Sequence, residues 1–73
     1  MPARIFSGWI VMDIHGRPQG LDTASGGYPY VAEAISSIHF WQTKTACEEY
    51  VRTINYGNKG YWAARVILKI IDE

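Results

Sequence analysis

The stretch that most constrains the fold runs from Trp62 to Ile71 and reads Trp-Ala-Ala-Arg-Val-Ile-Leu-Lys-Ile-Ile. It is rich in β-branched residues and lacks Gly and Pro, which is typical of a strand. Successive side chains of a strand point to opposite faces, so the even-numbered residues form a wholly apolar face. The odd-numbered residues include Arg65 and Lys69 and form a mixed face. A helix fits the β-branched content less well, so the segment is predicted to be a strand with one face on a core.

The length of the chain limits what this strand can be part of. With 73 residues it is predicted to form a single domain, residues 1–73. A core of this size seldom supplies more than about 3–5 kcal/mol and usually needs reinforcement. An internal disulfide is excluded because Cys47 is the only cysteine, yet 48% of the residues are hydrophobic and three are Trp. Self-association as a homodimer or higher homo-oligomer is the predicted remedy.

The charge balance argues against a nucleic-acid partner. Seven Lys and Arg residues match seven Asp and Glu residues, so the net charge is zero and long-range steering toward phosphates is not expected. The first residues lack the pattern of a signal peptide, and no uncharged run approaches the ~20 residues that cross a bilayer. We therefore expect a soluble, cytoplasmic protein without a membrane partner.

The first half of the chain reads as one strand followed by irregular structure. Residues 5–14 are apolar at both parities, which suits a strand covered on both faces or in contact with another subunit. Residues 15–20 are predicted to form a turn and residues 21–27 a loop. Pro29 restricts residues 28–30 to an edge strand, or to a strand that begins after it. Residues 31–37 are ambiguous, and we favour a short turn followed by a brief strand over residues 38–41.

The period changes at residue 43. Apolar side chains at i, i+3, i+4 and i+7 predict an amphipathic helix over Thr45–Ile54. These side chains are Cys47, Tyr50, Val51 and Ile54. Either Thr43 or Thr45 has the position of a helix cap. Gly57 or Asn58 is available for a left-handed cap at the other end.

The predicted fold is α+β, ββαβ-like, with a mainly antiparallel sheet of three or four strands and the helix on one face. The helix is predicted to cover the even-numbered face, so that Leu68→Ala would cost about 2–5 kcal/mol. That face comprises Phe6, Ile10, Met12, Val66, Leu68 and Ile70. The opposite face is predicted to stay uncovered and to form the homodimer contact. It comprises Trp9, Val11, Ile67 and Ile71 beside Arg65 and Lys69.

No catalytic or metal site follows from the residue types. The conventional metal ligands lack the spacing of a known metal motif, although Asp13 and His15 share a strand face. Cys47 lies on the apolar stripe of the predicted helix, where a packing role is favoured over a nucleophilic one. We therefore expect a protein that is not an enzyme and that holds no cofactor and no metal.

The most distinctive stretch is Ser-Gly-Gly-Tyr-Pro-Tyr at residues 25–30. The backbone of Gly26 and Gly27 is a candidate anion-binding nest, and Tyr28 and Tyr30 are candidates for stacking or for contact with a partner. A glycine-rich turn whose tyrosines cover a thin core explains the same residues. We take these four residues as candidate binding residues, together with Trp9, Arg65 and Lys69 on the predicted uncovered face.

The same stretch carries a resemblance. It is followed by Ile38-x-Phe40, by a Thr-initiated helix with Ala46, Glu48, Glu49 and Tyr50, and by a closing strand. In these features the chain resembles small uncharacterised proteins encoded by tailed bacteriophages and prophages. The resemblance implies a non-enzymatic accessory protein of a phage-infected bacterium that binds and modulates or inhibits a host defence factor.

Three hypotheses of function follow. The first is a phage-type protein that binds a host protein. The alternative is a small-molecule or nucleotide binder that uses the Gly-Gly-Tyr-Pro loop, which a ligand-dependent rise in melting temperature would reveal. The third is a single-stranded nucleic-acid binder, which ranks last because Arg4, Arg65 and Lys69 are too few to form a basic groove.

Overall fold

The computed structural model describes residues 3–56 and 59–71. The elements follow one another as β1 (Ala3–Met12), β2 (Gln19–Asp22), η1 (Thr23–Ser25), β3 (Tyr28–Val31), η2 (Ile35–Ser37), α1 (Lys44–Ile54) and β4 (Trp62–Ile71). The predicted α+β class is confirmed. The four strands are divided between two antiparallel two-stranded sheets, β1–β4 and β2–β3.

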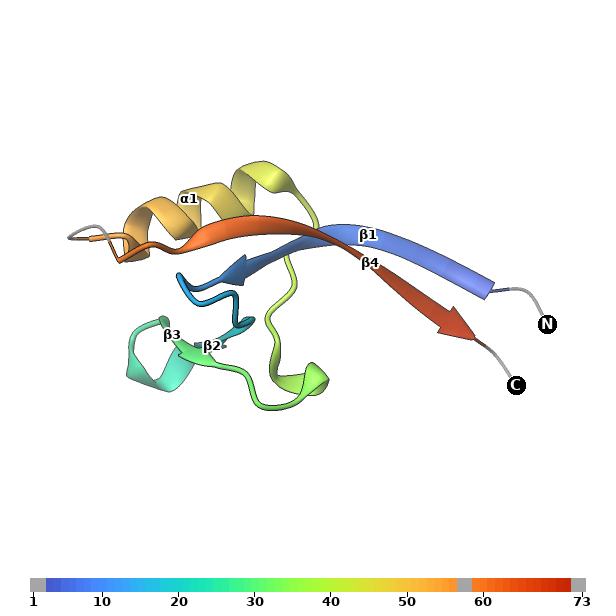
Figure 1. Ribbon diagram of the computed structural model, residues 1–73, viewed down its shortest axis with the longest axis horizontal. Coiled ribbons are helices and arrows are strands. Elements are labelled where there is room, and N and C mark those ends of the chain that lie inside the picture. Colours follow the sequence, from blue (N-terminus) through green and yellow to red (C-terminus); the bar gives the residue numbers. More distant parts are fainter. Residues whose placement is uncertain (1–2, 57–58, 72–73) are drawn as a thin grey trace.

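The ladder between β1 and β4 is the longest strand pairing in the described part of the molecule. Its register is continuous from Ala3 opposite Ile71 to Met12 opposite Trp62. At one end of this ribbon α1 lies on one face and β2–β3 on the other, while the two chain ends lie beyond the covered part (Figure 1). The ribbon is therefore the middle layer of three over only part of its length.

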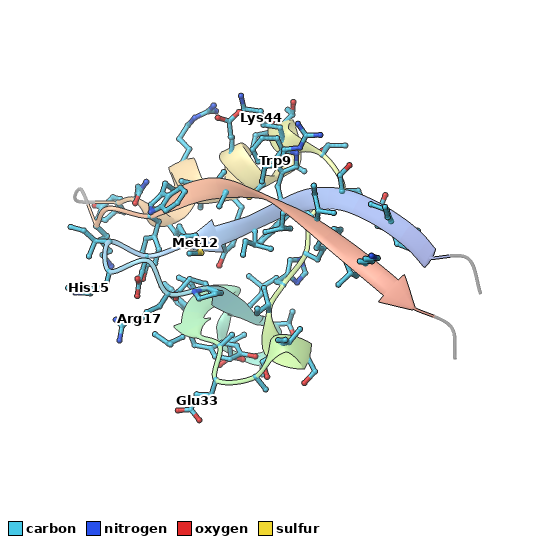
Figure 2. The ribbon with its side chains drawn as sticks, turned by 45° about the vertical axis from the view of Figure 1, so that its right-hand side comes forward. Trp9, Met12, His15, Arg17, Glu33 and Lys44 are labelled. Atoms are coloured by element: carbon cyan, nitrogen blue, oxygen red, sulfur yellow. The ribbon has the colours of Figure 1, made fainter. Side chains whose placement is uncertain are left out.

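The helix lies on the odd-numbered face of the ribbon. The Nζ atom of Lys44 is 5.5 Å from the centroid of a Trp9 ring, and Val51 borders the same hollow as Ala63. Figure 2 shows Trp9 beside Lys44, whereas Met12 points to the opposite side of the ribbon. The prediction that α1 covers the even-numbered face is therefore wrong, as is the prediction that Trp9 and Val11 are left uncovered.

Residues 35–40 cover the even-numbered face in place of the helix. Ile38 and Phe40 approach Ile10 and Val66 there. Gly8 makes this approach possible, because a Cβ atom at this position would lie 2.1 Å from Cζ of Phe40. The sequence pattern showed that this face is apolar, but the choice of cover depended on this close contact.

The helix begins after Thr43, whose hydroxyl accepts a hydrogen bond of 3.2 Å from the backbone N–H of Ala46. Of the two predicted caps, Thr43 is the one used. After the helix, the Asn55 side chain both donates to the Tyr61 carbonyl and accepts from the Tyr61 N–H, each at 2.8 Å. This pair of bonds fixes the return into β4. The predicted caps Gly57 and Asn58 lie outside the described residues.

The middle of the chain differs in detail from the prediction. The predicted loop over residues 21–27 begins inside β2, and β3 includes Pro29 as an edge strand should. The predicted strand over residues 38–41 is reduced to one residue, Trp41, which exchanges two backbone hydrogen bonds of 2.8 Å with Trp9. After Trp41 the chain turns to the helix cap, so the strand predicted over residues 38–41 does not form in full.

No helix within the described ranges has the length and apolar character needed to cross a membrane.

Candidate functional site

The far half of the β1–β4 ribbon projects from the body of the molecule. We call residues 3–7 of β1 and residues 67–71 of β4 the arm (Figure 1). The molecule measures 47 × 22 × 22 Å, consistent with this projection. Large apolar side chains remain exposed on the arm: Ile5 at 66%, Phe6 at 48%, Ile67 at 69% and Leu68 at 45%. Ile5 and Ile67 lie on the odd-numbered face of the ribbon and Phe6 and Leu68 on the even-numbered face, so both faces of the arm expose apolar surface. Exposed apolar surface of this kind is typical of an interaction site.

The arm carries charge of one sign only. The charged residues of β1 and β4 are Arg4, Arg65 and Lys69, and neither strand contains Asp or Glu. Lys69 stands opposite Ile5 in the ladder, and Arg65 stands opposite Trp9 at the border with the body. Arg65 and Lys69 lie on the odd-numbered face of the ribbon, where acidic residues of a partner would complement them.

An apolar cleft lies where the arm meets the body. One hollow of about 240 Å³ is lined by Ile10, Ile35, Ile38, Phe40, Val66, Ile67 and Leu68. A second of about 490 Å³ is lined by Phe6, Ser7, Phe40, Gln42 and Leu68. Because the two hollows share Phe40 and Leu68, we treat them as one surface and call it the arm cleft. Its size and lining suit an apolar segment of another protein.

A separate groove lies at the other end, between β2–β3 and the end of α1. Its volume is about 700 Å³, within the range of small-molecule sites. We call it the tyrosine groove, since its lining includes four tyrosines and one cation. The lining residues are Leu21, Gly26, Gly27, Tyr28, Pro29, Tyr50, Thr53, Ile54, Tyr56, Lys59 and Tyr61.

A hydrogen bond joins the two walls of the tyrosine groove. The hydroxyl of Tyr50 on α1 donates to the carbonyl oxygen of Gly27 at 2.6 Å. Burial, with a smaller contribution from neighbouring Tyr61, raises the pKa of Tyr50 above its ordinary value. The hydroxyl therefore stays protonated at neutral pH and remains a donor. Tyr50 also lies 5.0 Å from Trp41, ring centroid to ring centroid, which ties the groove to the body.

The backbone at the predicted anion-binding glycines is turned and partly engaged. Gly26 and Gly27 both have positive φ, at 83° and 85°. The N–H of Gly27 is also engaged, because it donates to the Asp22 carbonyl at 2.8 Å. The glycines instead turn the chain so that Tyr28 reaches the groove.

The other predicted binding residues fall in three different places. Tyr30 lies against Gly20, where a Cβ atom would be 2.5 Å from the Tyr30 ring, and it does not line the tyrosine groove. Trp9 is half-buried beside Lys44, while Lys69 is exposed on the arm. The structure therefore brings Gly26, Gly27 and Tyr28 together in the tyrosine groove, sets Trp9 opposite Arg65 in the β1–β4 ladder, and places Tyr30 outside the groove.

Two groups of residues that matter here were not predicted as binding residues. Tyr50, Tyr56, Lys59 and Tyr61 join Tyr28 from a distant part of the chain. Ile35 and Phe40 form the far wall of the arm cleft. The available signal was the run of aromatic residues on either side of the loop after the helix, which single-sequence periodicity does not assign to a common surface.

The groups capable of chemistry are used for structure. Burial, with a contribution from Glu48, raises the pKa of the fully buried Cys47 thiol, which makes it a poor nucleophile. Among the described residues no three His, Cys, Asp or Glu side chains come together as metal ligands.

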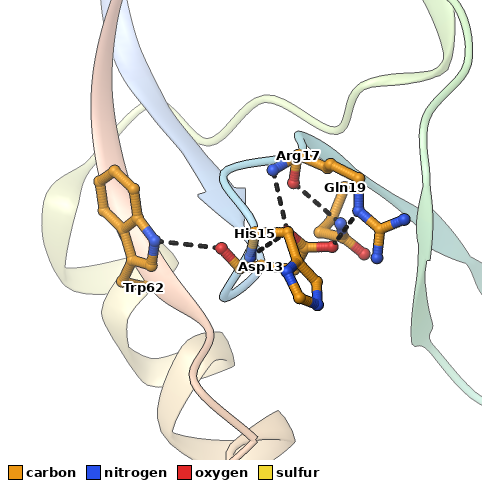
Figure 3. Close-up of polar contacts among 5 residues, drawn as sticks. All are labelled: Asp13, His15, Arg17, Gln19 and Trp62. Carbon is orange, nitrogen blue, oxygen red and sulfur yellow. Dashed lines mark hydrogen bonds and ion pairs between the residues drawn. The ribbon is translucent and has the colours of Figure 1, made fainter.

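Asp13 holds the turn after β1 together (Figure 3). Its carboxylate accepts from the N–H groups of His15 and Arg17 at 2.9 Å each and from Nε of Arg17 at 2.7 Å. Its carbonyl accepts from Nε1 of Trp62 at 3.2 Å. Burial alone would raise the pKa of Asp13, but these hydrogen bonds and the charge of Arg17 outweigh it and lower the pKa below 3.8. With its oxygens occupied by donors, Asp13 is a structural residue.

Comparison with protein-family models, with curated proteins and with solved structures found no match to this chain. The two surfaces must therefore be interpreted from their own chemistry.

Proposed function

We propose that this chain is a non-enzymatic accessory protein of phage type that binds and modulates a bacterial host protein through the arm cleft. The observation that supports this is the position of the exposed apolar side chains. Ile5, Phe6, Ile67 and Leu68 lie on the projecting half of the ribbon, beside a cleft of matching character. In this proposal the bacterial cytoplasm is where the two proteins meet.

The arm also defines the chemistry of the partner. The lining of the arm cleft is apolar apart from Ser7 and Gln42, and Arg65 and Lys69 lie on the other face of the ribbon, so an apolar partner segment fits best. A short helix or strand with apolar anchors would place them between Phe40 and Leu68. Enzymatic activity is not part of the proposal.

The test compares proteins retained from a bacterial lysate by the tagged wild type and by two variants. Leu68→Glu places a charge in the arm cleft, and Tyr56→Glu places the same charge at an exposed position in the tyrosine groove. We expect a host protein that is retained by the wild type and by Tyr56→Glu and lost with Leu68→Glu. Its binding is then measured with both purified proteins. Equal retention by all three proteins would refute the role of the arm cleft.

The tyrosine groove favours a second candidate function, the binding of a small molecule. Tyrosine rings offer stacking surfaces for a planar aromatic ring, and Lys59 offers a positive charge for one anionic group. A nucleotide has both features. The N–H of Gly27 already donates to the Asp22 carbonyl, so the phosphate of a bound nucleotide would depend on Lys59.

A nucleotide panel in a thermal-shift assay tests this second function. Selective binding to the native protein raises its melting temperature. Tyr28→Ala should abolish the rise, and Tyr30→Ala should preserve it, because Tyr30 is the matched tyrosine that does not line the groove. A panel without any shift would argue against a nucleotide ligand.

A further inference from the structure

We propose that the free edge of β1 in the arm pairs with the same edge of a second copy of this chain. The pairing joins two ribbons into one sheet with the strand order β4–β1–β1–β4. This inference rests on backbone geometry and is independent of the proposed function. It replaces the predicted dimer contact through the odd-numbered face, because α1 covers Trp9 and Val11 of that face. The other residues of that predicted contact were Ile67 and Ile71 beside Arg65 and Lys69.

The backbone groups that would make this contact follow from the ladder. In an antiparallel strand, alternate residues direct both their N–H and C=O groups to the same side. Trp9 directs its groups away from β4, because both are bonded to Trp41. Ile5 and Ser7 share the parity of Trp9 and therefore also face away from β4. Within the described chain, no hydrogen bond is made to the outward groups of Ile5 and Ser7.

The segment of the chain that pairs with β1 at Trp9 does not continue along the rest of the β1 edge. Trp41 runs antiparallel to β1, but the backbone enters α1 at Lys44 and leaves the edge beyond Trp9. An open hollow borders the same edge, lined among others by Ser7 and Gln42. A second strand can therefore continue along β1 where Trp41 stops.

Charge distinguishes the two edges of the arm. Within the arm, the residues of β4 whose backbone groups face outward are Ile67, Lys69 and Ile71, and Arg65 has the same parity at the border with the body. Cationic side chains at an edge strand oppose strand addition, a common protection against association. The corresponding residues of β1 are Ala3, Ile5 and Ser7, which carry no charge. Strand addition is therefore directed to β1.

The available length fixes the register. Pairing about a two-fold axis at Ile5 sets Ile5 opposite its own copy and Ala3 opposite Ser7, with outward groups facing one another. A shift in one direction would set Ala3 against Trp9, whose groups are already bonded to Trp41. A shift in the other direction leaves Ser7 without a partner inside the strand. In the central register Arg4 stands opposite Phe6, so no two like charges meet.

The contact is small. A pairing over residues 3–7 buries less than the ~800 Å² per partner of a standard interface, so the dimer should depend on protein concentration. It removes part of the exposed Ile5 side chain from water and extends a thin two-stranded sheet.

Cysteine crosslinking tests the register. Hydrogen-bonded antiparallel pairs have Cα atoms about 5.5 Å apart, within the range that a disulfide spans. Ile5→Cys should therefore form a covalent dimer of twice 8.3 kDa under mild oxidation. Ile67→Cys is the matched control, with the same residue type and nearly the same exposure on the other edge, 69% against 66%. The native Cys47 is buried and contributes little background.

Crosslinking of Ile5→Cys at least ten times faster than that of Ile67→Cys supports the proposal. Equal rates, faster linking of Ile67→Cys, or no linking of either would overturn it. Light scattering of Ile5→Lys and Ile67→Lys gives an independent measurement, because only the first sets two like charges opposite each other. Ile5→Lys should be monomeric at concentrations where Ile67→Lys is dimeric, and the same mass for both would also overturn the proposal.

Discussion

The covered and projecting halves of the β1–β4 ribbon are made of the same two strands in one continuous register, yet their surroundings are opposite. In the covered half Val11 is fully buried and Ile10 is 7% exposed, between α1 on one face and residues 35–40 on the other. In the arm, Ile5 and Ile67 face solvent. An apolar strand therefore need not lie in the core over its whole length. The part that extends beyond its covering elements stays exposed and is a candidate contact surface.

The largest expected difference between the halves is that between Ile10→Ala and Ile5→Ala. Ile10 is buried, so its truncation should lower the free energy of unfolding by about 2–5 kcal/mol. Ile5 is exposed in the single copy, so the same truncation should cost less than about 0.5 kcal/mol. Urea denaturation of dilute samples measures both values. Similar losses for the two variants would mean that the arm also belongs to the core.

Gly8 marks the border between the halves and gives the next largest effect. A methyl group at Gly8 would overlap the Phe40 ring and lie 2.7 Å from the Trp41 carbonyl oxygen. Gly8→Ala should therefore displace residues 40–41 and cost about 1–3 kcal/mol. Ser7→Ala, on the neighbouring residue, should change stability little. A fully stable Gly8→Ala protein would show that the cover of the even-numbered face is looser than described.

Tyr50→Phe weakens the attachment of β2–β3 to the helix with a smaller effect. It removes the 2.6 Å hydrogen bond to the Gly27 carbonyl and should cost about 0.5–1.5 kcal/mol. Tyr56→Phe is the control, since this exposed side chain should tolerate the loss of its hydroxyl. Thermal denaturation separates the two variants. An unchanged midpoint for Tyr50→Phe would mean that the walls of the tyrosine groove are held by other contacts.

Acid should act on the covered half through Asp13. The pKa of Asp13 is lowered in the folded state, so its contribution to stability is present above the unfolded pKa and is lost as the pH falls through the folded value. Asp13→Asn should therefore be less stable than the wild type at neutral pH, with the difference shrinking in acid. The effect is expected to be modest, because Arg17 is more than half exposed. Unfolding followed from pH 7 to pH 2 would contradict the assignment if the difference stayed constant.

Much of the fold could be predicted from the sequence because its signals are local. Alternation and β-branching identified the strand Trp62–Ile71, and the spacing from Cys47 to Ile54 identified the helix. The choice of face could not be predicted, since both faces of residues 5–14 are apolar and the deciding contact joins Gly8 to Phe40. The loss of stability predicted for Leu68→Ala must also be lowered, because Leu68 is 45% exposed on the arm.

The candidate surfaces were less predictable. Gly26, Gly27 and Tyr28 were found from a local motif, but their partners Tyr50, Tyr56 and Tyr61 come from the helix and from the segment after it. Predicting the arm would have required knowing where the covering segments end, and this depends on tertiary packing. Trp9 shows the limit most clearly, since a residue predicted to meet a partner protein instead meets Lys44 of its own chain.

Amide hydrogen exchange at two protein concentrations tests most directly the claim that the uncovered half of the ribbon is where the protein associates. In dilute solution the N–H of Trp9 should be protected by its bond to Trp41, while those of Ile5, Ser7 and Ile67 should exchange rapidly. At high concentration Ile5 and Ser7 should become protected and Ile67 should not. Rapid exchange at Ile5 and Ser7 at every concentration, or equal protection of Ile67, would contradict the account.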